Sequence, residues 1–127
     1  MNVDTQGHLP TLRGLLTFRI RELSADLHAL QLARERLLSD VAATEVTDQK
    51  DEAQASQESD LSDATQDRMR LELKQHEQAL QRMDGERYGD CVDCEEPIPW
   101  PRLLAQPAAE RCADCQRAFE RHAQGVA

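Results

Sequence analysis

All four cysteines of this 127-residue chain lie in one short stretch, as two Cys-x-x-Cys pairs. The first pair is Cys91 with Cys94, the second is Cys112 with Cys115, and seventeen residues separate the pairs. Two thiolates from each of two tight turns complete a tetrahedron around Zn²⁺, and this spacing is typical of four-cysteine zinc sites. Because four protein ligands leave no coordination position for water or substrate, we expect one zinc ion with a structural role.

Two disulfides are the main alternative interpretation of these cysteines. The amino-terminal sequence lacks the apolar core of a signal peptide, and no stretch approaches the length of a membrane span. We therefore expect a cytoplasmic protein, and in that compartment paired cysteines are more often metal ligands than disulfides. A thioredoxin-type redox site is disfavoured, because no strand–helix–strand pattern surrounds either pair.

The residues that precede the cysteines have the spacing of a coiled coil. Ile20, Leu27 and Val41 supply much of the apolar seam between leucines that recur every seven residues. A heptad pattern over more than four repeats predicts a long helix over residues 9–43. The heptad leucines are Leu9, Leu16, Leu23, Leu30 and Leu37.

A second apolar seam resumes weakly at Leu61 and becomes regular from Met69 to Met83, in steps that alternate between four and three residues. Gly85 follows it and is typical of a helix end. Because the two seams have similar lengths around one polar turn, they predict an antiparallel hairpin. Homodimerisation through the same seam is the competing arrangement. Two arginines, Arg13 and Arg34, fall on positions of the first seam and weaken it locally.

The sequence thus predicts a mainly α-helical protein in four parts. Residues 1–8 are expected to be a flexible lead, and residues 9–84 a long antiparallel two-helix coiled coil with an acidic tip near residues 44–53. Residues 85–115 form the predicted zinc finger, and residues 116–127 a short C-terminal helix and tail. A two-helix hairpin has little core, so a metal at its open end would contribute on the order of 10 kcal/mol to local folding. Trp100 is expected to cover the zinc site.

The polar turn between the seams is strongly acidic. Residues 45–67 hold eight carboxylates and a single lysine, and the whole chain has a formal net charge of −9. This charge argues against a nucleic-acid-binding protein, which needs basic surface to contact phosphates. By composition alone, a solvated loop is the favoured interpretation. However, Asp48 and Asp51 are three residues apart, so on a helix they share a face that could meet a basic site of a partner.

An enzyme is the weakest hypothesis for this carboxylate pair. General acid–base catalysis requires a positioned group in a site that shifts its proton affinity, and an exposed tip offers no such site. A protein that binds other proteins through its coiled coil is favoured over a catalyst.

The run GERYGDCVDCEEPIPWPRLLAQPAAERCADC resembles the zinc finger of the DksA/TraR family of bacterial transcription factors. In full-length DksA members, this finger follows an antiparallel coiled coil whose tip carries an Asp-x-x-Asp-x-Ala motif. Here residues 48–53 read DQKDEA, so Asp48, Asp51 and Ala53 match the motif. Besides the cysteines, the matching finger residues include Tyr88, Gly89, Ile98, Arg102, Leu103 and Pro107.

The resemblance implies that the protein is a monomeric transcription regulator. It would bind RNA polymerase through the secondary channel and modulate initiation with its acidic tip, without sequence-specific binding to DNA. A zinc-stapled adaptor that uses the coiled coil to bind another protein is the alternative.

Three departures from the family pattern modify this expectation. The amino-terminal segment that packs on the finger in the family is missing or reduced. Glu95 follows Cys94 where glycine is usual, which predicts strain in that turn. Family members bind guanosine tetraphosphate with basic residues near the finger and on the second arm. Arg68 matches one of these and is expected to contact the nucleotide or polymerase, but Gln75 and Gln116 replace others, so the chain is not expected to respond to this nucleotide.

Overall fold

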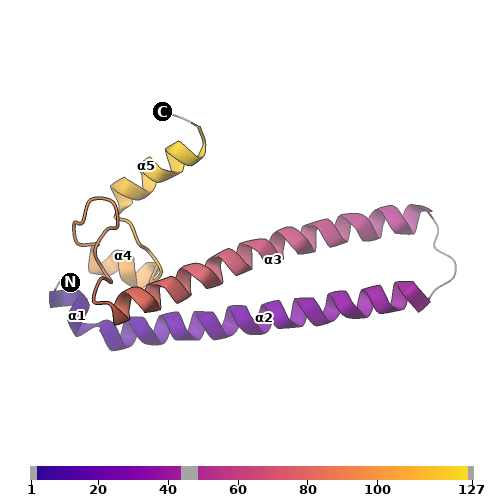
Figure 1. The fold of residues 1–127 in the computed structure, drawn as a ribbon, viewed down its shortest axis with the longest axis horizontal. Helices are drawn as coiled ribbons and strands as arrows, with labels where there is room; N and C mark the ends of the chain where they lie inside the picture. Colours follow the sequence, from indigo (N-terminus) through magenta and orange to yellow (C-terminus); the bar gives the residue numbers. More distant parts are fainter. Residues whose placement is uncertain (1–2, 44–48, 126–127) are drawn as a thin grey trace. The chain divides into compact units, whose positions relative to one another are not determined.

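The computed structural model describes residues 3–43 and 49–125, and the side chains of residues 3–40 and 63–125. Figure 1 shows α2 and α3 side by side, with shorter helices in the rest of the described chain. None of the helices in the described ranges is long and apolar enough to cross a membrane. The predicted mainly α-helical fold is confirmed. Its elements are α1 (Val3–Gly7), α2 (Leu9–Ala43), α3 (Gln49–Asp84), α4 (Trp100–Ala105) and α5 (Ala113–Ala123).

The chain divides into two compact units, and both contain part of the long helices. One unit combines residues 1–19 with residues 75–127, and the other consists of residues 20–74. Each unit therefore holds one section of α2 and one section of α3. The cysteine-rich region belongs entirely to the first unit.

The long helices pair in antiparallel fashion, as ion pairs in the two units show. Arg13 of α2 donates to Asp84 of α3 at 3.0 Å, and Arg34 of α2 pairs with Asp63 of α3. Later residues of α2 thus meet earlier residues of α3, which confirms the hairpin. Both arginines occupy seam positions where the sequence predicted local weakness. All four side chains stay at least 40% exposed, so each pair contributes only about 0–1 kcal/mol.

The core of the first unit joins the long helices to the finger. Leu12 and Leu16 of α2 are fully buried, as are Ala79 of α3 and Tyr88, Ile98 and Leu103 of the finger, and all belong to one cluster with Met83 and Cys91. The Tyr88 hydroxyl donates to the Pro107 carbonyl at 2.7 Å. Burial raises the pKa of Tyr88 to about 12, so the donating form of the phenol persists at neutral pH. The finger therefore completes a core that two helices alone would leave open.

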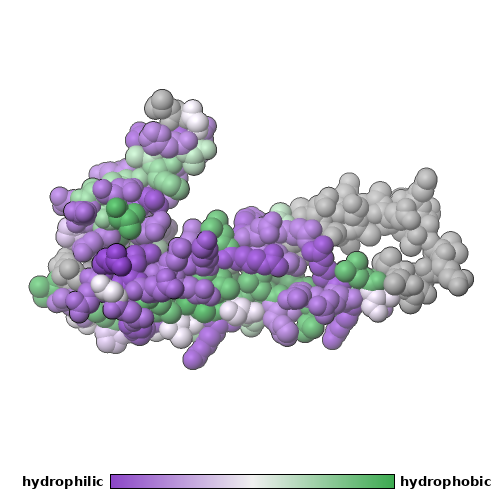
Figure 2. Space-filling model, viewed as in Figure 1, coloured by the Kyte–Doolittle hydropathy of each residue, from purple (hydrophilic) through white to green (hydrophobic). Residues whose placement is uncertain are grey.

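The seam of the second unit is narrower. Leu23 is fully buried, and Leu27 and Leu30 are half-buried. The heptad residue Leu37, however, is 62% exposed. The opposing start of α3 is rich in carboxylates and amides, with Leu61 as its only leucine before Leu71, so it offers few apolar partners. Figure 2 accordingly shows hydrophobic residues exposed along the long helices, on a surface that is mostly hydrophilic.

The amino-terminal residues differ from the flexible lead that the sequence suggested. Residues 3–7 form α1, and the side chain of Thr5 is fully buried. Its Cγ2 lies 3.0 Å from the position that a Cβ on Gly89 would occupy. His8 continues this contact by stacking on Trp100, with the ring centroids 3.9 Å apart. These contacts connect the amino-terminal segment to the finger, which its polar composition did not indicate.

The helix α3 ends just before Gly85, as the sequence predicted, but the residue with a left-handed backbone is the one after Gly85. α3 ends at Asp84, and Glu86, not Gly85, has a positive φ of 59°. The Arg87 amide then donates to the Arg82 carbonyl at 2.8 Å, which satisfies one of the free carbonyls at the helix end. A left-handed conformation costs a residue with a side chain about 1–2 kcal/mol.

Gly89 is the glycine whose substitution we expect to be most harmful. Its φ of 91° lies outside the range that other residues readily adopt, and Thr5 approaches it closely. We predict that Gly89→Ala lowers the free energy of unfolding by about 1–3 kcal/mol. Urea denaturation followed by circular dichroism would measure this change.

Gly85→Ala is the matched control. A Cβ at Gly85 would make ordinary contacts, the nearest at 3.6 Å to the Gln81 carbonyl oxygen, and its φ is not in the left-handed region. We expect the unfolding free energy to change by less than about 0.5 kcal/mol. Equal losses from the two substitutions would contradict the close packing of α1 on Gly89.

Candidate metal centre and coiled-coil tip

The first cysteine pair lies in a tight turn between two bridged residues. Asp90 and Pro97 form an isolated antiparallel β-bridge. Inside it, the Cys91 amide donates to the Glu96 carbonyl at 2.8 Å, and the Glu95 amide donates to the Cys91 carbonyl at 2.9 Å. This turn directs the side chains of Cys91 and Cys94 to one side, as two ligands of a single ion require.

The second cysteine pair lies at the beginning of α5. Cys112 is the N-cap residue, with an extended backbone, and Cys115 follows in the first turn. The C-terminal helix thus begins at Ala113, inside the predicted finger and three residues before the expected boundary at residue 116. The Val92 amide donates to the Glu110 carbonyl at 2.9 Å, which ties the first turn to the segment that leads into α5.

The four sulfur atoms form a compact cluster. All lie within 4.8 Å of one another, and the Sγ atoms of Cys94 and Cys112 are 3.9 Å apart. Tetrahedral ligands at the usual Zn–S distance of about 2.3 Å are about 3.8 Å apart, whereas a disulfide needs about 2.05 Å. All four cysteines are free thiols. The geometry therefore fits a single tetrahedral metal ion and contradicts two disulfides.

The thiols differ in proton affinity. Burial acts to raise the pKa of Cys91, but hydrogen bonds from the backbone amides of Cys94, Cys112 and Asp93 outweigh it and lower the pKa to about 6. The pKa of Cys115 is raised, chiefly through its hydrogen bonds to Cys112 and Cys91. The Cys91 thiolate thus forms readily, whereas Cys115 resists ionisation. A divalent cation supplies the charge that keeps all four sulfurs ionised.

Glu95 has the strained conformation that the sequence suggested. Its φ is 64°, in the left-handed region where glycine carries no penalty. The turn enforces this conformation, because the hydrogen bonds of Cys91 to Glu95 and Glu96 close it on both sides. The strain lies in the segment that positions Cys94.

A network of charged residues holds α5 against the finger. The Arg111 guanidinium lies 4.0 Å from the centre of the Phe119 ring, a favourable cation–π arrangement. Its Nε donates to Asp93 at 2.8 Å, and one terminal nitrogen donates to Glu110 at 2.7 Å. The sequence predicted a short helix here but gave no indication that Arg111 covers Phe119.

Trp100 covers the finger in a different way from the one expected. It is half-buried at the start of α4, packs against the apolar cluster and stacks on His8. Its partner is therefore the segment between α1 and α2. An isolated histidine such as His8 gives no signal in the sequence of a distant aromatic partner.

The predicted tip residues are only partly within the described chain. Asp48 lies outside the described residues. Asp51 and Ala53 belong to the first turns of α3, but their side chains are outside the described set. Arg68, further along α3, is exposed. Their assignment to partner binding thus remains a prediction.

Comparison with known proteins agrees with this architecture. A family model described as the prokaryotic dksA/traR C4-type zinc finger matches residues 86–121. A Salmonella typhimurium protein named RNA polymerase-binding transcription factor DksA is 33% identical over 109 residues, which cover 78% of this chain and 72% of that protein. A Haemophilus influenzae protein with the same name is 34% identical over 84 residues.

The overlap with these relatives is incomplete. The match to the Haemophilus protein covers 66% of this chain and 58% of the relative. The structure of transcription factor DksA2 from Pseudomonas aeruginosa superposes with a TM-score of 0.75, and the match covers 93% of this chain and 87% of that structure. At 24% identity, that likeness concerns the fold. Together, the family match and the sulfur geometry establish a C4 site for one structural Zn²⁺.

We predict that Glu95→Gly stabilises the finger by about 1 kcal/mol, since glycine adopts a φ of 64° without strain. Thermal unfolding of the zinc-loaded protein would measure the gain. Glu96→Gly is the control, because Glu96 is exposed and has no positive φ. Glycine there removes a carboxylate in the same way but is expected to be neutral or destabilising. Equal effects of the two substitutions would show that charge, not strain, is responsible.

We also predict that removal of zinc by a chelator unfolds the finger and that added zinc restores it. Without the ion, the sulfur cluster loses the charge that holds its thiolates together. Trp100 fluorescence would report the change, since this side chain packs on the finger core. Metal analysis should find one zinc per chain. A spectrum unaffected by the chelator, together with two disulfides in mass spectrometry, would contradict the assignment.

Proposed function

Because the chain belongs to the DksA/TraR family of C4 zinc-finger proteins, we propose that it is a transcription regulator that binds RNA polymerase. The observation that carries this proposal is the match to a protein named for polymerase binding over 72% of that protein's length. The paired α2 and α3 and the four-cysteine finger agree with it. We propose a cytoplasmic monomer that is not an enzyme and does not read DNA sequence.

We further propose that the coiled coil enters the secondary channel of polymerase and that Asp48, Asp51 and Ala53 form its effector tip. Three features support this assignment: the sequence DQKDEA matches the family motif, α3 begins within it at Gln49, and residues 45–67 are strongly acidic. The small side chain of Ala53 would permit close approach. The tip would act by binding one polymerase state more tightly than another. A preference of about 1.4 kcal/mol shifts their ratio tenfold.

We also propose that the chain makes limited use of guanosine tetraphosphate. Arg68 is present on α3 as a contact to the nucleotide or polymerase, and it is exposed. Gln75 and Gln116 are neutral where basic residues are expected, so they would give a nucleotide anion less electrostatic attraction. We therefore propose a regulator that acts on polymerase largely without this nucleotide.

We predict that Asp48→Asn combined with Asp51→Asn abolishes the transcriptional effect but leaves polymerase affinity within about threefold, or about 0.7 kcal/mol. The reason is that the tip would distinguish polymerase states, while the rest of the coiled coil and the finger would supply most of the binding. Transcription with purified polymerase, along with a direct binding assay, would separate the two effects.

Glu58→Gln combined with Asp60→Asn is the matched control. It removes the same two charges from the acidic stretch, outside the motif, and should retain the effect. Unchanged transcription in the tip variant would refute the tip assignment. Failure of the unaltered chain to bind polymerase would refute the proposed function. A strong response to guanosine tetraphosphate in the same reactions would refute nucleotide independence.

A further inference from the structure

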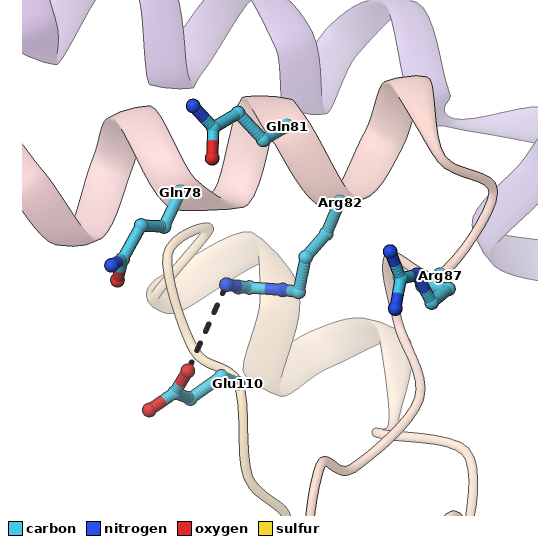
Figure 3. Close-up of a pocket in the computed structure, with 5 residues that line it drawn as sticks. All are labelled: Gln78, Gln81, Arg82, Arg87 and Glu110. Carbon is cyan, nitrogen blue, oxygen red and sulfur yellow. Dashed lines mark ion pairs between the residues drawn. The ribbon is translucent and has the colours of Figure 1, made fainter.

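A pocket of about 320 Å³ lies beside the end of α3, within the first unit. Figure 3 shows its lining: Gln78, Gln81 and Arg82 come from α3, Arg87 from the segment after it, and Glu110 from the segment before α5. Its volume is at the lower end of the range for small-molecule sites, and all five lining residues are polar or charged. It is separate from the sulfur cluster, because none of the cysteines lines it.

Arg82 is a largely buried charged group of this pocket, and its contacts are weak. Its side chain is only 16% exposed, yet its contacts are long: 3.8 Å to the Glu110 carboxylate and 3.5 Å to the Ala108 carbonyl. Burial is the main influence on its pKa and lowers it, and the attraction of Glu110 does not offset this. A half-buried guanidinium with weak partners retains donors for a further oxygen ligand.

Glu110 is engaged more strongly elsewhere. Its carboxylate accepts a 2.7 Å hydrogen bond from Arg111, which also donates to Asp93. Arg82 and Arg111 both contact Glu110, and Arg87 also lines the pocket. The lining residues thus carry two positive charges and one negative charge, although the chain as a whole is acidic.

Arg87 and the two glutamines complete a set of donors at the mouth of the pocket. Arg87 is exposed and folds back over the end of α3, where its Nε lies 3.7 Å from the Cβ position of Gly85. No carboxylate in the described part of the chain forms an ion pair with it. Gln78 and Gln81 are exposed and offer neutral amide donors one turn earlier. Such a combination of guanidinium and amide groups suits an oxyanion.

We propose that this pocket receives a carboxylate from an aspartate or glutamate side chain of RNA polymerase, a docking contact that rests on the proposed function. The carboxylate would lie against the Arg82 guanidinium, which Figure 3 shows between Gln78 on one side and Arg87 on the other. Glu110 forms one wall, so a dianionic phosphate would meet more repulsion than a monoanionic carboxylate. A carboxylate also matches the planar fork of arginine, which binds its two oxygens together.

Charge reversal at Arg87 tests the contact without removing a residue of the core. We expect Arg87→Glu to weaken binding to core polymerase by about tenfold and to reduce the salt dependence of the affinity. The matched control is Arg121→Glu on α5, an exposed arginine outside the pocket, which should change the affinity less than twofold. Fluorescence anisotropy of labelled protein at several salt concentrations gives both quantities, and thermal unfolding verifies that both variants are folded.

A second variant tests the pocket from its other side. Gln78→Glu places a carboxylate at the mouth from an exposed helix position and should weaken binding to a similar extent, whereas Gln124→Glu near the carboxyl end should not. If the unaltered chain binds polymerase and both pocket variants bind equally well, the docking contact is refuted and the proposed function stands. If the unaltered chain does not bind polymerase, both are refuted.

A titration with small anions tests the type of ligand. With ¹⁵N-labelled zinc-loaded protein, sodium acetate should shift the arginine side-chain resonances of Arg82 and Arg87 weakly and in proportion to its concentration, and inorganic phosphate should do no more. This result would support a carboxylate presented by a partner. Saturable binding of phosphate below about 1 mM would instead show a site for a free phosphorylated ligand and would overturn the carboxylate assignment.

Discussion

The shortage of core in a two-helix hairpin is the constraint on which the rest of this structure depends. In the first unit, α2 and α3 themselves contribute only four buried side chains: Leu12, Leu16, Ala79 and Met83. The finger adds Tyr88, Ile98 and Leu103 to the same cluster, and Cys91 joins the cluster to the sulfur site. Burial of apolar area and ligation of the metal thus stabilise one shared region. A chain with four aromatic residues obtains a core in this way.

The metal centre has a structural role, so other parts of the chain must make the contacts to a partner. Four thiolates complete the coordination of zinc, so the ion has no open position for a substrate. The surrounding contacts, from the Tyr88 hydroxyl to the Arg111 network, connect finger, helices and α5. The features suited to a partner lie elsewhere: an acidic stretch between the seams, and a locally basic pocket at the end of α3.

Among the residues that the structure describes, the two non-glycine residues with a left-handed backbone lie in turns at the finger. Glu86 and Glu95 both have a positive φ, and both occupy positions where glycine would avoid the cost. Each conformation is held by hydrogen bonds of the neighbouring backbone, from Arg87 to Arg82 in one turn and between Cys91 and Glu96 in the other. A fold stapled by a metal tolerates such local cost because the turn has no alternative geometry that also brings the sulfurs together.

The sequence by itself determined the zinc ligands, the two long helices and their antiparallel order. Cysteine spacing and heptad periodicity are local patterns, and each reports directly on the geometry that produces it. The sequence also indicated strain at Glu95, because this residue stands in the turn where glycine is usual. The acidic tip remains a prediction from its match to a family motif, because its side chains lie outside the described set.

Only the tertiary structure decided the contacts between distant segments. The ordering of α1 depends on Thr5 meeting Gly89, and the position of Trp100 depends on His8. The pocket depends on α3 and the segment before α5 meeting side by side. Leu37 continued the heptad pattern, yet it is exposed, because burial requires an apolar partner on the opposing helix and not only the correct spacing. Periodicity describes one helix at a time, whereas burial and unsatisfied charge are properties of two surfaces in contact.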